Sequence, residues 1–203
     1  MELKRFLEKL SSDTPTPGGG SASALAGALS ASLVAMVAGL SSKRGDTKMK
    51  GAAGIRKRGL SIQERLFRAI DEDSKSFDAV IEAFRLPKSS ERMRLRRARR
   101  IQKAYREATL IPRQVCQQCL RLLEYSRTLV SKGNPKAISD AGVAAFLADA
   151  ALAGGMLNIK INLGGVTEKT FVKRMNALMR DWSRKRNQLM KMIIMKLTGF
   201  SHG

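Results

Sequence analysis

The spacing of apolar residues predicts helices along almost the whole chain. Apolar side chains recur every three or four positions over residues 2–10, 48–84, 89–130 and 167–197, with Thr167 as the expected cap of the last segment. Residues 21–41 and 139–157 are rich in Ala, Gly and Ser, which suits closely packed helices. Only residues 158–163 alternate as a strand would. The pattern predicts one all-α domain over 1–203, a bundle of long helices with a Gly-rich loop before the second helix.

Composition supports a packed helical protein. Hydrophobic residues make up 43% of the chain and aromatic residues only 5%, which favours helices over a β-sandwich. Pro112 is expected to kink or restart the helix that contains it. No charge occurs between Gly18 and Ser42, a length that can span a bilayer, but the serines and glycines there favour a core helix and no membrane contact. The charged N-terminal segment has no signal-peptide pattern, so we expect a cytoplasmic protein.

The scarce residues exclude several kinds of site. The only histidine is His202, which argues against a histidine-based triad or a histidine-rich zinc site. Cys116 and Cys119 form a lone CxxC with no second pair, so we expect structural thiols and no metal site. Two thiols without a disulfide framework also indicate a reducing compartment.

The charge balance implies an anionic partner. Lys and Arg number 38 against 17 Asp and Glu, a formal net charge of +21. The run KSSERMRLRRARRIQKAYR at 88–106 is the densest part, and it can be either a solvated helical face or a surface for nucleic acid. Tyr105 is its only aromatic residue, so it offers no stacking platform for bases.

One carboxylate lies where the helical period predicts an apolar side chain. Asp73 falls between Ile70 and Phe77 on a stripe that we expect to be buried, whereas other charged residues of the segment fall on the opposite side. A buried carboxyl must be paired, hydrogen-bonded or neutral, and desolvation raises its pKa toward the range of a general acid. A purely structural role remains open. The expected stripe comprises Leu66, Ile70, Phe77, Val80, Ile81 and Phe84.

The PGGGS segment at 17–21 is a second candidate site. Glycines permit a sharp turn at a helix entrance, where exposed backbone amides attract anions or polar ligand edges. It lacks the GK[ST] of a P-loop and is not GxGxxG, so a simple helix-entry turn is the alternative.

Five separated motifs resemble one family. PTPGGGSASALAGALSASLVAMV, DEDSKSFDAVIEAFRLPK at 71–88, the helix reaching Ile111-Pro112, GNPKAISDAGVAA at 133–145 and LNIKINL at 157–163 are similar, in order and spacing, to the formiminotetrahydrofolate cyclodeaminases and the related methenyltetrahydrofolate cyclohydrolases. The resemblance implies an all-helical homodimer with a folate site near the subunit interface. It implies ring closure of 5-formiminotetrahydrofolate with loss of ammonia, or hydrolysis of 5,10-methenyltetrahydrofolate to 10-formyltetrahydrofolate.

The resemblance also implies site residues. Asp73 occupies the position of the family's catalytic acid, and no cofactor is expected beyond the tetrahydrofolate substrate, whose polyglutamate tail the basic surface would attract. Asp140 is equally consistent with a charge at a helix start. The residues that we expect to bind substrate are Pro17, Gly18, Gly19, Gly20, Ser21, Lys43, Arg44, Ser139, Asp140, Asn158 and Asn162.

One segment departs from the family pattern. SSKRGDTKMK at 41–50 keeps Lys43 and Arg44 but lacks the aromatic residue that members usually carry there. The sequence therefore leaves cyclohydrolase and cyclodeaminase both open. Two other classes stay in view: a basic helical nucleic-acid-binding protein, for which non-specific contact alone would be weak support, and a non-catalytic folate-binding relative.

Overall fold

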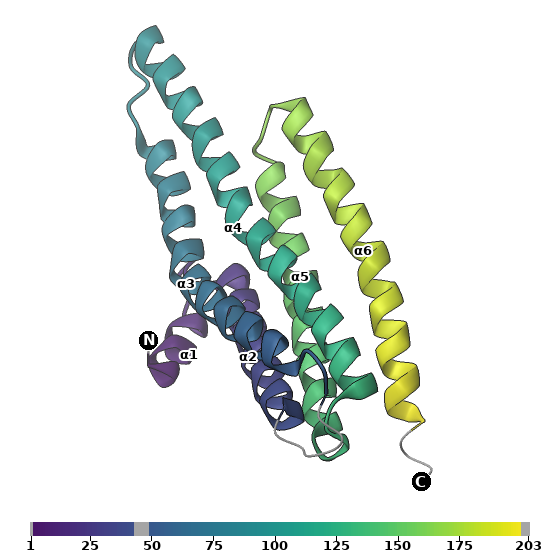
Figure 1. Ribbon diagram of the computed structural model, residues 1–203. Helices are drawn as coiled ribbons and strands as arrows, with labels where there is room; N and C mark the ends of the chain where they lie inside the picture. Colours follow the sequence, from purple (N-terminus) through teal and green to yellow (C-terminus); the bar gives the residue numbers. More distant parts are fainter. Residues whose placement is uncertain (1, 43–48, 200–203) are drawn as a thin grey trace.

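The computed structural model describes residues 2–42 and 49–199, and these residues contain helices and no strand. The long helices run side by side, with the short first helix against the outside of the bundle (Figure 1). The elements are α1 (Leu3–Leu10), α2 (Gly19–Ser42), α3 (Ala52–Arg85), α4 (Glu91–Lys132), the 3₁₀ turn η1 (Pro135–Ala137), α5 (Ile138–Leu163) and α6 (Lys169–Thr198).

Two local predictions were wrong, and a third was wrong in part. The alternating segment 158–163 is the last part of α5, because Ile159 and Leu163 are buried one turn apart while Ile161 faces outward. Pro112 lies inside α4, so the helix does not restart there. Thr167 does not cap α6. That helix begins after Glu168, and Thr167 instead donates from its backbone N–H to Oε1 of Gln102, at 2.8 Å.

Small side chains bring the central helices into close contact. On α2 the buried positions are mostly Ala, Gly and Ser, and an added Cβ at Gly27 would lie 3.0 Å from Sγ of Cys119 on α4. Ser30 donates its hydroxyl to the Ala144 carbonyl of α5 at 2.7 Å, which satisfies a buried polar group across the helix pair. The sequence-based expectation of a small-residue core helix is therefore confirmed for α2.

The α3–α4 hairpin extends beyond the ends of α5 and α6 (upper left in Figure 1). A separate small apolar cluster holds its two helices together, made of Val80, Ala83, Ala104 and Ala108. Ser90 starts α4 by accepting a hydrogen bond from the Met93 backbone N–H at 3.3 Å. The part of the hairpin that extends beyond α5 and α6 can therefore line a pocket on one side and present an exposed surface on the other sides.

Two helices are long and apolar enough to cross a membrane by length and composition alone. They are α2 and the segment Pro135–Leu163, and about half of each apolar stretch is buried inside the bundle (56% and 44%). Core helices of soluble proteins have the same composition, so this property is weak support for a membrane span.

Candidate functional site

A pocket of about 490 Å³ lies where the loop before α2 meets α3, α4 and the end of α5. Its inner part is formed by the glycines of the PGGGS segment and by Asp73, and its outer part by aromatic side chains of the α3–α4 hairpin. This size and mixture of apolar walls with a few polar groups is typical of small-molecule sites. The predicted residues that line it are Gly18, Gly19, Gly20, Asp73, Asn158 and Asn162.

Asp73 is held by the first turn of α2. The buried Ser21 hydroxyl lies 3.0 Å from Oδ2 of Asp73 and 2.9 Å from the Ile70 carbonyl, and it can donate to either. Burial raises the pKa of the Asp73 carboxyl above its usual range, and the hydrogen bonds from Ser21 oppose part of that rise. A partly buried carboxyl with a raised pKa, facing a pocket, is suited to accept and return a proton during a reaction.

Gly20 allows the loop to approach this carboxyl. A Cβ built at Gly20 would overlap the Asp73 side chain, at 2.5 Å from Cγ and closer still to Oδ1. Any residue other than glycine would therefore displace the carboxyl or the helix start. The sequence predicted that these glycines form a ligand-binding turn, and here the glycine is needed for contact with the acid.

Aromatic rings form the outer wall of the pocket. Phe77 and Phe84 on α3 are 38% and 44% exposed, and Tyr105 on α4 meets Phe84 edge-to-face at a centroid distance of 6.1 Å. The prediction that the whole apolar stripe of this segment is buried was thus wrong for Phe77 and Phe84, and Ile81 is only half-buried. Leu66, Ile70 and Val80 are buried as expected, but α2 does not reach the outer half of α3. The rings face the pocket instead.

Two asparagines of α5 complete the polar groups. The Asn158 amide nitrogen donates to the Gly154 carbonyl at 2.9 Å, and the Asn162 amide nitrogen donates to the Ala108 carbonyl of α4 at 2.8 Å. These bonds fix both side chains and leave their Oδ1 atoms to accept hydrogen bonds from a ligand. The sequence alone had singled out both residues, although it placed them on an extended segment.

The structure does not bring every predicted residue to this pocket. Pro17 faces a neighbouring hollow beside α1. Ser139 and Asp140 lie at the start of α5, about 27 Å along the helix from Asn158. Lys43 and Arg44 lie outside the described residues. Sequence reasoning missed the pocket-lining role of Tyr105 and Ile161, and it took the phenylalanines for core residues, although they share a helical side with Asp73.

The two cysteines lie in the core. Both are fully buried on α4, and burial raises the pKa of the Cys116 thiol to about 12. The Cys116 thiol points toward the Leu152 carbonyl of α5, at 3.6 Å. In the part of the chain that the structure describes, no three His, Cys, Asp or Glu side chains gather as metal ligands would. The thiols therefore have a packing role here.

Comparison with known proteins finds similar enzymes over most of the chain. The chain is 37% identical to a methenyltetrahydrofolate cyclohydrolase of Methylorubrum extorquens, over 84% of this chain and 83% of that protein. It is 28% identical to the formimidoyltransferase-cyclodeaminase of Mus musculus, of which it spans about a third (32%). A solved structure, the formiminotetrahydrofolate cyclodeaminase of Thermotoga maritima, superimposes with a TM-score of 0.89 at 26% identity, covering 99% of this chain and 98% of that one.

The family resemblance seen in the motifs is confirmed. The family described as formiminotransferase-cyclodeaminase matches residues 2–181, which include the PGGGS segment, Asp73 and both asparagines. The match spans α1 to α5 and the first part of α6, so it includes every element that lines the pocket. The chain belongs to the formiminotransferase-cyclodeaminase family.

Proposed function

We propose that this protein is a folate one-carbon enzyme that hydrolyses 5,10-methenyltetrahydrofolate to 10-formyltetrahydrofolate, with Asp73 as the proton-transfer group. The observation that carries the proposal is the partly buried Asp73 carboxyl, held by Ser21 against Gly20 at the inner end of the pocket. The similarity to a cyclohydrolase along most of both chains supports hydrolysis as the first candidate.

In this reaction one proton is transferred twice, first from water to a carboxylate and then from the same carboxyl to N5. Water adds to the methenyl carbon between N5 and N10, and the carboxylate of Asp73 takes a proton from that water. The carbon–N5 bond then breaks as Asp73 returns the proton to N5. The hydroxyl on the same carbon releases its proton to solvent and becomes the carbonyl of the formyl group, which stays on N10. A carboxyl with a raised pKa suits both halves of this exchange, which typically contributes about a hundred- to ten-thousand-fold in rate.

The pocket has a fitting place for each part of the substrate. The Oδ1 atoms of Asn158 and Asn162 can accept hydrogen bonds from the pterin N–H groups, and the rings of Phe77, Phe84 and Tyr105 can pack against the aminobenzoyl ring. No further cofactor enters the proposed steps, because one carboxyl carries out both proton transfers and the reaction is not a redox reaction.

Cyclodeamination is the second candidate. There N10 attacks the formimino carbon of 5-formiminotetrahydrofolate and the departing ammonia takes a proton, a role that the same carboxyl can fill. The close superposition on a cyclodeaminase is the reason to assay this activity as well.

The functional unit in this proposal is a homodimer. The outward side of α5 is apolar along its length, with Val143 49%, Phe146 50% and Ile161 74% exposed, and Leu29 on α2 is 50% exposed. A second copy would remove this surface from water. Ile161 also lines the pocket, and an antiparallel pairing of α5 would bring Ser139 and Asp140 of one copy toward the pocket of the other. A monomer by light scattering at micromolar concentration would contradict this arrangement.

The substrate in this proposal carries a polyglutamate tail. Arg97 donates twice to the Phe84 carbonyl, both at 3.1 Å, and its guanidinium lies 5.4 Å from the Phe84 ring centre. A positive charge is therefore held at the outer end of the pocket, where a tail would leave it. Arg97→Gln should raise KM for the polyglutamyl substrate more than for the monoglutamyl one. A salt-independent KM for the polyglutamyl substrate would contradict the idea.

The direct test follows the methenyltetrahydrofolate chromophore. Wild type should accelerate its decay, and Asp73→Asn should lower kcat by about a hundred- to ten-thousand-fold with substrate binding retained. Asp78→Asn is the matched control, because Asp78 is an exposed carboxylate on another side of α3. Ammonia release from the formimino substrate is measured on the same three proteins. Wild-type turnover by Asp73→Asn in both assays would remove Asp73 from the mechanism.

A further inference from the structure

A row of exposed cations follows α4 on the side away from the pocket that holds Asp73. The intervals between them are four, three, four and three residues, so they share one side of the helix, and the row spans about 21 Å. We call it the α4 cation row; it consists of Arg92, Arg96, Arg99, Lys103 and Arg106. Tyr105 and Ala108 of the same helix face the pocket instead, so the two surfaces are separate.

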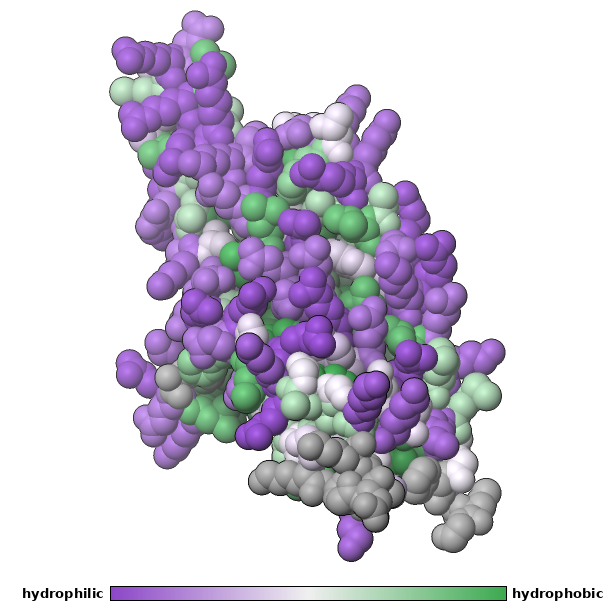
Figure 2. All heavy atoms as spheres, viewed as in Figure 1, coloured by the Kyte–Doolittle hydropathy of each residue, from purple (hydrophilic) through white to green (hydrophobic). Residues whose placement is uncertain are grey.

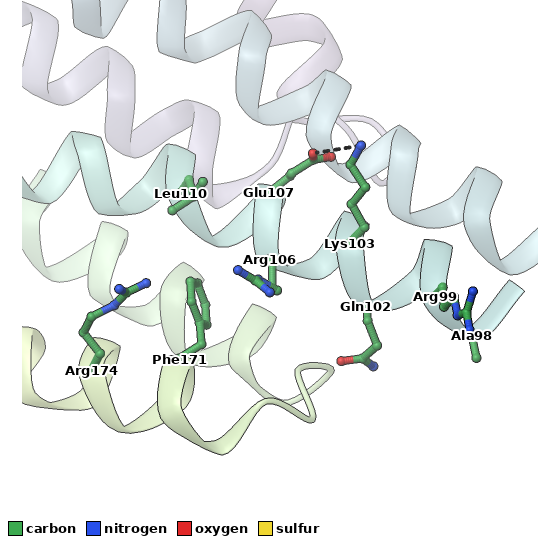
Figure 3. Close-up of a pocket in the computed structure, with 9 residues that line it drawn as sticks. All are labelled: Ala98, Arg99, Gln102, Lys103, Arg106, Glu107, Leu110, Phe171 and Arg174. Carbon is green, nitrogen blue, oxygen red and sulfur yellow. Dashed lines mark ion pairs between the residues drawn. The ribbon is translucent and has the colours of Figure 1, made fainter. Parts of the chain in front are cut away.

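Two adjoining hollows follow this row. One, of about 820 Å³, lies beside the first turns of α4, and the other, of about 690 Å³, lies between α4 and α6. Arg99 lines both, so the two hollows adjoin at its side chain, and we call them together the groove (the second hollow is drawn in Figure 3). Figure 2 shows mostly hydrophilic side chains on the projecting hairpin, and the exposed apolar residues Met93 and Leu95 belong to the same segment. Residues 85–106 hold ten Lys and Arg against one acid, Glu91.

Most of these charges form no ion pair with the carboxylates that the structure describes. Lys103 pairs with Glu107 at 3.7 Å, and Arg106 pairs with Glu168. Four arginines along the groove form no ion pair with any described carboxylate, namely Arg92, Arg96, Arg99 and Arg174. All four are exposed. Unpaired cations in a row repel one another, and an anionic ligand would relieve that repulsion.

The inner end of the groove is preorganised. Phe171 of α6 is buried, and the guanidiniums of Arg106 and Arg174 lie 5.3 Å and 5.5 Å from its ring centre (Figure 3). Stacking on the ring restricts two long side chains, which lowers the entropy lost when they bind an anion. Gln102 fixes the neighbouring loop by donating to the Gly165 carbonyl at 2.9 Å.

We propose that the α4 cation row, with Arg174, binds the phosphate backbone of nucleic acid without sequence preference. Planar guanidiniums on a rigid helix suit phosphate oxygens, and a 21 Å row matches about six base pairs of a duplex. Phe171 has guanidiniums against its ring and is buried, so the groove offers no ring for base stacking, and contact with the backbone is what remains.

Other anionic partners fit this surface less well. A membrane is flat and would meet only the tip of the hairpin, whereas the row continues into a groove between two helices. A polyglutamate tail leaving the pocket would have to pass around α4 to reach the row, because the two lie on different sides of that helix.

The test measures binding of the full chain to a labelled duplex of about 20 base pairs, as DNA and as RNA, by fluorescence anisotropy from about 50 to 200 mM salt. Four to five neutralised phosphates predict a slope of log K against log salt near about −4, and Arg96→Gln/Arg99→Gln should reduce its magnitude by about 2. Lys191→Gln/Lys196→Gln is the matched control, because it removes the same charge from exposed positions at the far end of α6. Turnover of the monoglutamyl substrate should be the same in all three proteins.

Three outcomes would overturn the proposal. Equal loss of binding in both double variants would mean that net charge, not the row, attracts the duplex. Binding to phosphatidylserine vesicles that is lost in Arg96→Gln/Arg99→Gln, without duplex binding by wild type, would assign the row to a membrane. A raised KM for the polyglutamyl substrate alone, with unchanged duplex affinity, would assign it to the folate tail. None of these outcomes depends on whether Asp73 is catalytic.

Discussion

Replacing Gly20 by alanine should change the position of the Asp73 carboxyl while leaving the carboxyl group itself in place. The new Cβ would lie 2.5 Å from Cγ of Asp73, and ordinary contacts between such atoms are 3.4–4 Å, so the carboxyl must shift by about 1 Å. A displacement of about 1 Å at a reacting group can cost a hundredfold in rate. We therefore expect kcat to fall about a hundredfold, although both the acid and the Ser21 hydroxyl are still present.

Stability should change much less than activity in this variant. Alanine gains about 1 kcal/mol over glycine within a helix and overpacking costs about 1–3 kcal/mol, so the net loss of stability should be about 0–2 kcal/mol. Gly39→Ala is the matched control on α2, because its Cβ would lie an ordinary 3.5 Å from Arg56 and should raise Tm without loss of turnover.

The decisive comparison combines two changes. Turnover of Gly20→Ala, Asp73→Asn and the double variant is measured by methenyltetrahydrofolate decay, with Tm measured on the same samples. If the glycine acts only by placing the carboxyl, the double variant should be no slower than Asp73→Asn alone. Wild-type kcat in Gly20→Ala, or fully additive losses in the double variant, would refute the reasoning.

Three further predictions follow from burial. Phe77→Ala should raise KM with a stability loss under about 1.5 kcal/mol, whereas Leu66→Ala, in the core, should cost about 2–5 kcal/mol in urea unfolding; equal costs would contradict the assigned exposures. Because the fold raises the pKa of Asp73, wild type should lose stability relative to Asp73→Asn as pH rises from about 4 to 7, and thermal melts showing the reverse would contradict the raised pKa. Cys116 and Cys119 should resist a thiol reagent near pH 8 until the chain unfolds, because both are buried and the pKa of Cys116 is about 12; rapid labelling of native protein would contradict their burial.

The sequence predicted most of the fold because helical periodicity is a local property. The small-residue character of α2 and the stop before α4 followed directly from composition and turn residues. The strand prediction for 158–163 was wrong. Over so short a length, two residues buried one helical turn apart, with the exposed Ile161 between them, give the same alternation as a strand. Whether an apolar side of a helix is covered depends on its neighbours, so the exposure of Phe77 and Phe84 could not be predicted from α3 alone.

The candidate site was only partly predictable for the same reason. Asp73 was found because a carboxylate interrupts an apolar stripe, and its partner Ser21 was named without any indication of the hydrogen bond between them. Tyr105 belongs to a basic segment, and the charge of that segment did not indicate that another side of the same helix lines a pocket. That side faces the pocket because α4 packs against α3.

The pairing of α2 with α5 has a consequence for synthesis of the chain. Their contact at Ser30 and Ala144 joins residues 114 positions apart, and α5 ends 121 residues after α2 does. At about 5–20 residues per second, a ribosome would need about 6–24 s to complete α5 once α2 is made. Throughout that interval the apolar side of α2 that α5 later covers is open to other nascent chains and to chaperones. Packing of α5 on α2 therefore cannot begin before α5 has been made, and slower translation between the two helices would lengthen the period in which this side of α2 is uncovered.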